Sequence, residues 1–268
     1  MIPLPSQATS SGLRVVVLTC GDLGIEVANA LSCVAGVDVV ALFKSPWMRS
    51  ALSVRQKIRH VVRTQGVGGL FRVARSRILP RTTTTRELMS LDSRVTLLEF
   101  DDFHSPAARE RLVGLRPDLG VVAGTYILRD GIFDIPRYGS INLHSGKAQL
   151  YRGSAPAFWE LYNGETEVGI TIHRVSPAVD AGDVLRQEIF ALDSAPSGDP
   201  IAYIERYRRD VLRPNGVRML VDVVREIAAG TAIATAQDHS AARTYRAPDY
   251  KAVRELRARV RRRRGGAT

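Results

Sequence analysis

The sequence predicts an α/β protein built on a doubly wound, mostly parallel sheet, and three observations support this prediction. Short β-branched or apolar runs alternate along the chain with stretches of helical periodicity. The run at residues 119–123 is wholly apolar, as expected of a strand buried on both faces. Apolar residues make up 45% of the 268 residues, which suits one α/β domain with a modest appendage. In such a sheet an active site is expected outside the carboxyl ends of the strands.

The first elements follow from local patterns. The β-branched run RVVVLT at residues 14–19 predicts a strand that ends in the turn CGDLG. Gly24 then opens an amphipathic helix that ends near Ser32. The next elements expected are two strands and a helix, at residues 38–43, 95–100 and 106–115.

The later elements complete the sheet. After the apolar strand at 119–123, a strand at 140–144 follows the turn Pro-Arg-Tyr-Gly. Two further strands, at 169–175 and 184–192, flank the loop SPAVDAGD. A long helical pattern runs from about Pro200 to Ala229.

A basic insertion separates the second and third strands, at about residues 44–94. Two apolar sets at helical spacing predict two amphipathic helices there, namely Val54, Ile58, Val61 and Val62, then Leu70, Phe71, Ala74 and Ile78. The net charge of +11 is concentrated, because residues 44–94 carry +10 and residues 243–264 carry +8. We therefore expect an anionic partner or substrate to meet positive charge in these two segments.

The composition argues against several classes of protein. No run approaches the roughly 18 apolar residues of a membrane span, and residues 1–13 lack the order of a secretory signal, so we expect a cytoplasmic protein. Cys20 and Cys33 fall after a strand and inside a helix, which favours buried reduced thiols over a disulfide or a metal site. The turn at residues 20–24 lacks the three-glycine fingerprint of dinucleotide binding.

Three polar residues are placed to share one crevice. Asn142 and His144 lie two apart on a strand, so they point the same way where the strand ends. Asp180 comes from a later loop, in which Gly182 lets the backbone approach a ligand closely. The plainer interpretation makes Asn142 and His144 a satisfied loop pair and Asp180 a turn residue. The other histidines show no ligand spacing and are expected on the surface or in the core: His60, His104, His173 and His239.

Seven short blocks recur in the order and spacing of a known family. They are VVAGTYILRDGIF, Asn142-Leu143-His144, Tyr151-Arg152-Gly153, Ala155-Pro156, Asn163-Gly164, Gly169-Ile170-Thr171 and Val179-Asp180-Ala181-Gly182-Asp183. This pattern resembles the folate-dependent formyltransferases, which include methionyl-tRNA formyltransferase, glycinamide ribonucleotide formyltransferase and the sugar N-formyltransferases. The resemblance implies a catalytic domain at 13–192, interrupted by the insertion, and a helical, basic extension at 193–268.

The resemblance implies that Asn142, His144 and Asp180 are the catalytic residues. Formyl transfer to an amine passes through an oxyanion, to which Asn142 and a protonated His144 would donate hydrogen bonds. Asp180 would raise the imidazole pKa, or hold a water through which the proton of the amine reaches the leaving nitrogen.

The formyl donor implied by the resemblance is 10-formyltetrahydrofolate, with no metal. The backbone of Ala123, Gly124, Thr125, Tyr126 and Ile127 is expected to hold the folate pterin, and the loop with Val179, Ala181 and Gly182 to close the other side. The acceptor is expected to contact Lys147, Tyr151, Arg152 and Gly153. In one departure, Gly146-Lys147-Ala148-Gln149 stands where the family usually has Ser-Leu-Leu-Pro, which adds a charge and removes a backbone constraint.

Three functions remain as alternatives. The first is N-formylation of a small, phosphate-bearing amine, such as an amino sugar on a nucleotide. The second is formylation of initiator tRNA, with the insertion and the basic tail as phosphate contacts. Against it, the twenty residues from Asp249 to Thr268 are too few for the barrel that follows the catalytic domain in the tRNA-modifying members. The third is a formylfolate hydrolase or sensor. Peripheral contact with an anionic membrane is a weaker prediction.

Overall fold

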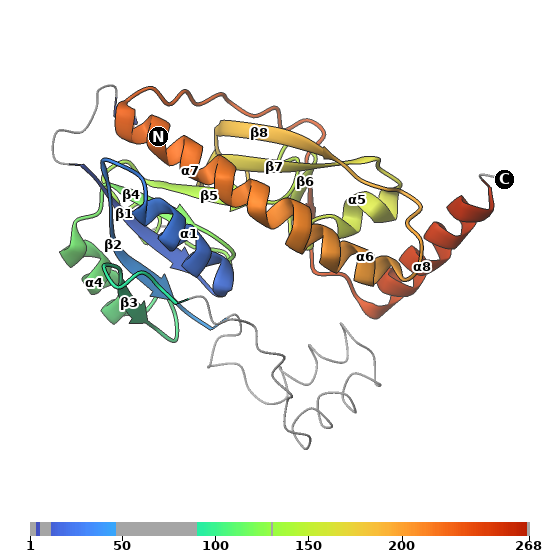
Figure 1. Ribbon diagram of the computed structural model, residues 1–268, viewed down its shortest axis with the longest axis horizontal. Coiled ribbons are helices and arrows are strands. Elements are labelled where there is room, and N and C mark those ends of the chain that lie inside the picture. Colours follow the sequence, from blue (N-terminus) through green and yellow to red (C-terminus); the bar gives the residue numbers. More distant parts are fainter. Residues whose placement is uncertain (1–3, 6–11, 47–89, 130, 267–268) are drawn as a thin grey trace, which may run out of the picture.

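The computed structural model describes residues 4–5, 12–46, 90–129 and 131–266, so the two helices expected in the insertion lie outside the described residues. The elements are, in order, β1 (Leu13–Thr19), α1 (Asp22–Ser32), β2 (Val37–Lys44), β3 (Thr96–Glu99), α4 (Pro106–Leu115), β4 (Leu119–Val122), β5 (Ser140–His144), β6 (Tyr151–Gly153), α5 (Phe158–Asn163), β7 (Glu167–Arg174), β8 (Val184–Ala191), α6 (Pro200–Tyr207), η1 (Arg208–Leu212), α7 (Arg213–Ala229), β9 (Arg243–Tyr245) and α8 (Tyr250–Gly265) (Figure 1).

A seven-stranded sheet forms the centre of the molecule, in the order β3-β2-β1-β4-β5-β7-β8. The strands from β3 to β5 are parallel, whereas β7 runs antiparallel to β5 and β8 antiparallel to β7. The predicted doubly wound, mostly parallel α/β fold is therefore confirmed. The winding reverses between β1 and β4, and in sheets of this kind ligands bind outside the carboxyl ends of the strands at such a point.

The sheet is buried on both faces, and β1 shows how alternation achieves this. Val15 and Val17 belong to the larger apolar cluster, which α1 and α7 complete, while Val16 and Leu18 belong to the smaller cluster on the other face. Figure 1 shows α1 and α7 side by side across the same face of the sheet. Buried residues of α6, α7 and α8 share the larger cluster with the strands, so the predicted extension at 193–268 packs on the same core.

The helical stretch expected at 200–229 is confirmed, and it contains one π-helical turn. α6 leads into one π-helical turn, η1, in which the amide of Arg213 bonds to the carbonyl of Arg208, and α7 then continues. Pro214 explains the wide turn, because it has no amide hydrogen to donate to the carbonyl four residues earlier.

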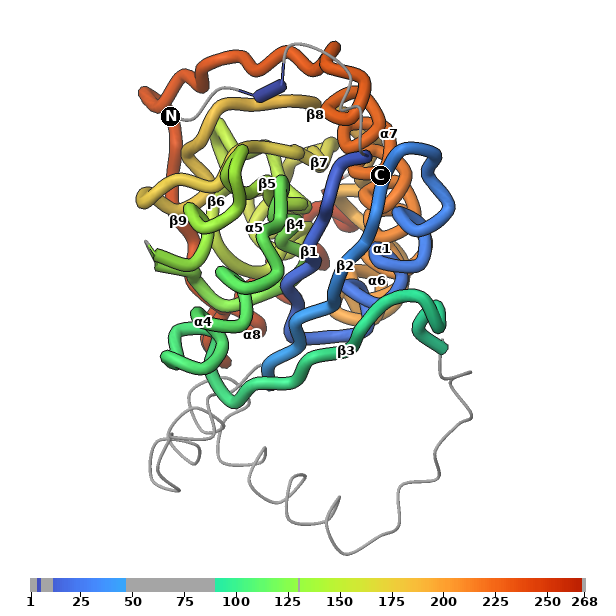
Figure 2. The backbone as a smooth tube through the Cα atoms, turned by 90° about the vertical axis from the view of Figure 1, so that its left-hand side faces the viewer, coloured from blue at the N-terminus to red at the C-terminus, as the bar shows by residue number. Residues whose placement is uncertain are grey.

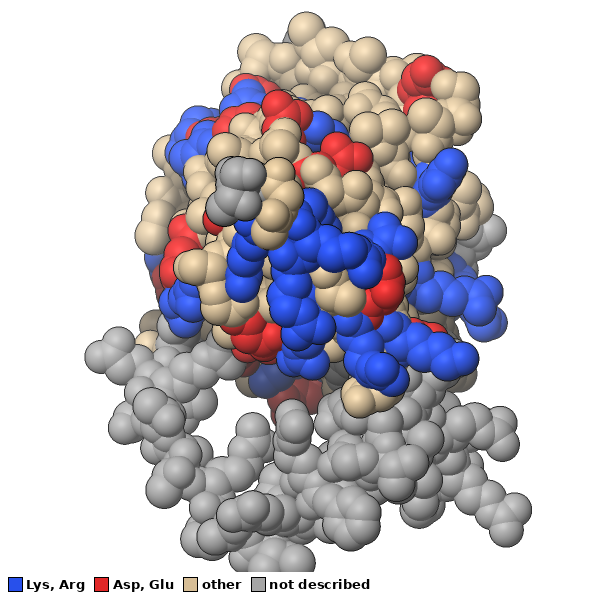
Figure 3. Space-filling model, turned by 90° about the vertical axis from the view of Figure 1, so that its right-hand side faces the viewer, with Lys and Arg blue, Asp and Glu red and all other residues tan. Residues whose placement is uncertain are grey.

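The basic tail is a docked helix. The Asp249 carboxylate caps α8 by accepting a hydrogen bond from the amide of Ala252 at 2.8 Å, and Leu256 and Val260 are fully buried. Several of its guanidinium groups donate hydrogen bonds to backbone carbonyl oxygens of neighbouring segments. Arg259 donates to Tyr162, Arg263 to Leu161 and Ser194, and Arg264 to Gly198. Figure 3 shows Lys and Arg side chains gathered on this end of the molecule.

We expect Val260→Ala to lower the free energy of unfolding by about 2 kcal/mol, because it removes two buried methyl groups and leaves a cavity. Urea unfolding followed by circular dichroism measures this change. Arg261→Ala, at an exposed position of the same helix, is the control and should change stability by about 0.5 kcal/mol or less. Equal stability of the wild type and Val260→Ala would show that α8 is not docked in solution.

Both cysteines are free thiols, but the prediction that both are buried is wrong for Cys33. Cys20 is half-buried, whereas Cys33 is exposed, because it caps the carboxyl end of α1. Within the described part of the chain, no helix is both long and apolar enough to cross a membrane. The same residues contain no group of three or more His, Cys, Asp or Glu side chains arranged to hold a metal ion.

Candidate active site

The end of β5 carries two of the predicted site residues. β5 pairs with β4 on one side and with the antiparallel β7 on the other, where Asn142 lies opposite His173 and His144 opposite Thr171. Asn142 is half-buried, and His144 is 8% exposed. Both therefore sit at the carboxyl edge of the sheet, two strands from β1, where the crevice was expected.

Asp180 joins them from the loop between β7 and β8. Its Oδ1 accepts a hydrogen bond from Asn142 Nδ2 at 3.3 Å, and its Oδ2 lies 3.4 Å from Nδ1 of His144. Oδ2 also accepts a hydrogen bond from the amide of Gly153 at 2.7 Å. The three side chains predicted to be catalytic thus meet in one constellation.

The loop that presents Asp180 is tightly constrained. Asp180 itself has a left-handed backbone, with φ of 49°, which is uncommon outside glycine and is often found at functional sites. A Cβ atom on Gly182 would lie 1.9 Å from the carbonyl oxygen of Arg174, so only glycine fits there. The Gln237 side chain donates hydrogen bonds to the carbonyls of both Asp180 and Gly182. These contacts fix the direction of the carboxylate.

His144 has oxygen atoms near both ring nitrogens. Nε2 lies 2.7 Å from the carbonyl oxygen of Tyr151, so we assign its hydrogen there, which leaves Nδ1 facing Asp180. Burial lowers the pKa of His144, although the carboxylate of Asp180 acts in the opposite direction. Burial thus favours the neutral ring at rest, with Nδ1 positioned to take up a proton, and the expected role of a protonated His144 stays a prediction.

Asp180 is ionised at neutral pH. Burial by itself would raise its pKa, but His144, His173 and the amide of Gly153 outweigh burial and lower the pKa to about 2. A carboxylate held in this state next to Nδ1 of His144 stabilises an imidazolium whenever one forms.

His173 is a site residue that the sequence did not identify. It was expected on the surface or in the core, yet its Nε2 lies 3.2 Å from Asn142 Nδ2 and 3.4 Å from Asp180 Oδ1. Its Nδ1 donates to the carbonyl of Arg174 at 2.8 Å, so Nε2 is the acceptor for Asn142. The signal was present in the alternation of β7, but it needed the antiparallel register against β5.

Of the four residues predicted to contact the acceptor, two lie at the constellation and two have other partners. The ammonium of Lys147 lies 2.7 Å from the carboxylate of Glu167, away from the constellation. The guanidinium of Arg152 binds Ala148, Gln237 and His239 and is buried among them. The two remaining residues are at the constellation itself, through the carbonyl of Tyr151 and the amide of Gly153.

The predicted folate segment follows β4 directly. Ala123 is buried, and its carbonyl accepts a hydrogen bond from Thr19 Oγ1 at 2.7 Å. Gly124 turns the chain with φ of 67°, and Ile127 beyond it is 67% exposed. The Tyr126 hydroxyl donates to Asp102 and accepts from the amide of Phe103. The segment therefore borders the switch point between β1 and β4, and its role in folate binding stays a prediction.

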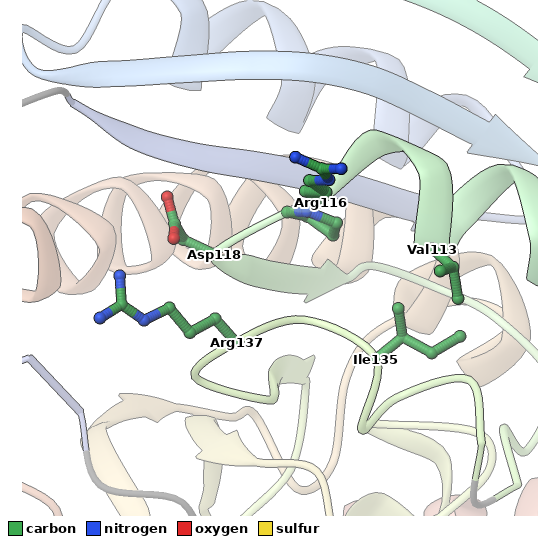
Figure 4. A pocket seen from close by; sticks show the side chains of 6 residues that line it. Val113, Arg116, Asp118, Ile135 and Arg137 are labelled. Atoms are coloured by element: carbon green, nitrogen blue, oxygen red, sulfur yellow. The ribbon is translucent and has the colours of Figure 1, made fainter.

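Two hollows differ in their relation to the constellation. A hollow of about 450 Å³ lies at the amino end of β4, the opposite edge of the sheet, and its lining includes Arg116, Asp118 and Arg137 (Figure 4). A narrow hollow lies between His144 at the end of β5 and Glu160 of α5, and we call it the β5–α5 hollow. Only the second one touches a predicted catalytic residue.

The family assignment follows from the sequence model described as formyl transferase, which matches residues 39–201 and so includes the whole constellation. The chain belongs to the formyl transferase family. Among curated proteins, it is 35% identical over 144 residues to the methionyl-tRNA formyltransferase of Chlorobium chlorochromatii (strain CaD3), covering 54% of this chain and 44% of that protein. The match to the enzyme of Chloroflexus aggregans (strain MD-66 / DSM 9485) is also 35%, over 147 residues, covering 54% and 45%. The match thus spans less than half the length of these relatives.

Solved structures share the fold of this chain. The N-formyltransferase of Helicobacter canadensis, in complex with folinic acid and dTDP-3-aminofucose, has a TM-score of 0.54 and 13% identity, over 92% of this chain and 80% of that one. Glycinamide ribonucleotide transformylase 1 of Symbiobacterium toebii has a TM-score of 0.52 and 20% identity, over 86% and 96%. The resemblance read from the sequence is confirmed at the level of the family.

Proposed function

We propose that this formyl transferase moves the formyl group of 10-formyltetrahydrofolate to the primary amine of a small, phosphate-bearing acceptor. The observation that carries the proposal is the meeting of Asn142, His144 and Asp180 at the carboxyl edge of the sheet. An amide donor, a neutral imidazole and an ionised carboxylate are the groups that acyl transfer to an amine requires.

Each side chain has one role in this proposal. Asn142 Nδ2 donates to the oxyanion that forms on the formyl oxygen, for which it gives up its contact with His173. His144 Nδ1 receives a proton from the attacking amine and passes it on to the leaving folate nitrogen. Asp180 stays ionised and stabilises the imidazolium between these two events.

Different observations support the proposed folate donor and the proposed class of acceptor. The family match and the folinic acid bound to the Helicobacter canadensis enzyme support a folate donor. The aminosugar nucleotide bound to the same enzyme supports a small acceptor with phosphates. The hollow beside His144 is narrow, which favours a single amine group over a bulky one.

The decisive experiment is a screen of primary amines with 10-formyltetrahydrofolate, in which absorbance follows the release of tetrahydrofolate. Nucleotide-linked amino sugars and amino sugar phosphates should give amine-dependent turnover. Formate released at the same rate without any amine would instead identify a hydrolase. Folate binding without turnover on any amine would contradict transferase activity.

We expect Asn142→Ala to lower the turnover number on the order of 100-fold, because one hydrogen bond to the oxyanion is lost. The dissociation constant for 5-formyltetrahydrofolate, measured by calorimetry, should stay within about twofold if Asn142 acts on the transition state. Asn29→Ala, far along α1, serves as the matched control and should leave turnover unchanged. Wild-type turnover in Asn142→Ala would refute the role of the amide.

Formylation of initiator tRNA is the second candidate, because the two curated relatives above are methionyl-tRNA formyltransferases. The arginines of α8 are weak support for tRNA binding, because several of them already bind backbone carbonyls. Binding of initiator tRNA across a salt series tests it, because each phosphate contact adds to the salt dependence. The absence of any binding at low salt would exclude this acceptor.

A further inference from the structure

Glu160 is a buried acid whose charge is not used by the constellation. It lies in the first turn of α5 and is only 2% exposed. Its Oε1 has no hydrogen-bond partner among the described residues. Burying an unsatisfied carboxylate is costly, so such a group calls for a specific explanation.

This carboxylate lines the β5–α5 hollow together with His144. The hollow has a volume of about 10 Å³, close to the room that one water molecule needs. One ammonium group is of similar size. The lining includes His144 but neither Asn142 nor Asp180, so an ammonium group held there borders the constellation through the imidazole alone.

Aromatic rings form a second wall of the hollow. The rings of Tyr151 and Tyr245 are stacked at 5.2 Å, and those of Trp159 and Tyr245 at 5.1 Å. All three residues line the hollow. These rings stack on one another and bound the hollow, while the carboxylate of Glu160 supplies the negative charge that attracts an ammonium group.

We propose that the Glu160 carboxylate binds the primary ammonium group of the acceptor in the β5–α5 hollow, which the rings of Trp159 and Tyr245 help to enclose. This inference rests on the proposed formyl transfer. It identifies the group that binds the ammonium of the acceptor. It also sets a size limit, since a primary ammonium fits and a quaternary one does not.

The site also solves a protonation problem. A primary amine is mostly ammonium at neutral pH and has no lone pair for attack. The ammonium gives one proton to Glu160 Oε1, which leaves the neutral amine. The amine then forms its bond to the formyl carbon, and its second proton goes through His144 to the folate nitrogen as the old carbon–nitrogen bond breaks. Glu160 returns its proton to water after the product leaves.

The protonation state of Glu160 suits this exchange. Burial raises its pKa to about 7, against the opposing effects of backbone amides at the start of α5 and of Arg208. A group with this pKa both accepts and releases a proton near neutral pH. The charged and titratable groups around it are Tyr207 of α6, Arg208 of η1, Glu165 after α5, His144 of β5, Tyr151 and Arg152 of β6, and Tyr245 of β9.

Ammonium binding is tested without any acceptor or folate, using ethylammonium chloride as the probe at constant ionic strength. Trp159 lines the hollow and reports occupancy by fluorescence, once the chain's other tryptophan is removed by Trp47→Phe in every variant. We expect a saturable change in emission at pH 8, with half-saturation at least tenfold higher in Glu160→Gln. Glu110→Gln, on the exposed side of α4, is the matched control and should behave as the parent. An equal response in Glu160→Gln, or an equal response of the parent to tetramethylammonium, would overturn the proposal.

Kinetics separate this inference from the function on which it rests. With the amine that the screen identifies, Glu160→Gln should raise the KM for the amine at least tenfold, leave the KM for 10-formyltetrahydrofolate unchanged, and abolish the fall of kcat/KM below pH 7. Transfer with wild-type amine kinetics in Glu160→Gln would refute the inference and leave the transferase intact. Conversely, Glu160-dependent ethylammonium binding in a protein that formylates no amine would support the ammonium site and refute the transferase.

Discussion

Replacing Asp180 with Asn is expected to lower formyl transfer on the order of 1000-fold, a larger loss than for any other single change in the site. Asp180 contacts Asn142, His144, His173 and the amide of Gly153, so one charge supports the whole constellation. Loss of that charge removes the stabilisation of the imidazolium, and the amide offers one acceptor oxygen where the carboxylate offers two, to Asn142 and to Gly153. Turnover of the amine found in the screen, with saturating 10-formyltetrahydrofolate, measures the effect.

Asn is the appropriate replacement because it tolerates the left-handed backbone of residue 180. A loss of turnover is therefore not caused by a rebuilt loop, and circular dichroism should match the wild type. Asp38→Asn, which breaks an exposed pair with Arg14, is the matched control and should retain full activity. If Asp180→Asn kept more than a tenth of the wild-type rate, the carboxylate would have no part in proton transfer.

Glu160→Gln is expected to gain about 2–3 kcal/mol of stability relative to the wild type when the pH rises from 5 to 8. The carboxyl has a pKa of about 7 in the folded protein, against an ordinary value of 4.5. A raised pKa means that the unfolded chain releases this proton first, so wild-type stability falls as the pH rises between these two values and stays low above pH 7. Gln does not titrate, so the variant does not lose this unfolding free energy as the pH rises.

Urea unfolding of both proteins at pH 5 and pH 8 measures this difference, in which the other titrating groups cancel. Burying the Gln amide changes the free energy of unfolding by the same amount at both pH values, so this contribution also cancels. A difference that does not change with pH would show that Glu160 is solvated. A buried acid that lowers stability while binding substrate is a common compromise at active sites.

The fold was predictable because its signals are local. The apolar run at 119–123 and the β-branched run at 14–19 each mark a buried strand, and both appear as β4 and β1 within one residue of their expected ends. β6 and β9 were not predicted, since each has three residues and their pairing joins segments about ninety residues apart. The π-helical turn was missed because its cause, Pro214, lies inside an otherwise regular helical pattern.

The site was predictable only as far as spacing and resemblance reach. Asn142 and His144 share a strand face, which alternation alone indicates. His173 needed the register of β7 against β5, and Glu160 was not singled out, because only its burial sets it apart. Lys147 was predicted to contact the acceptor; its ammonium is paired with Glu167, and the acceptor contact stays a prediction.

The docking of α8 bears on chemistry far from the chain's end. Arg263 holds the carbonyl of Leu161 and Arg259 that of Tyr162, and both carbonyls belong to the same short helix as Glu160. Six residues make too few internal hydrogen bonds to keep a helix rigid by themselves. The basic tail therefore stabilises the position of α5, and with it the buried carboxylate of Glu160 beside His144.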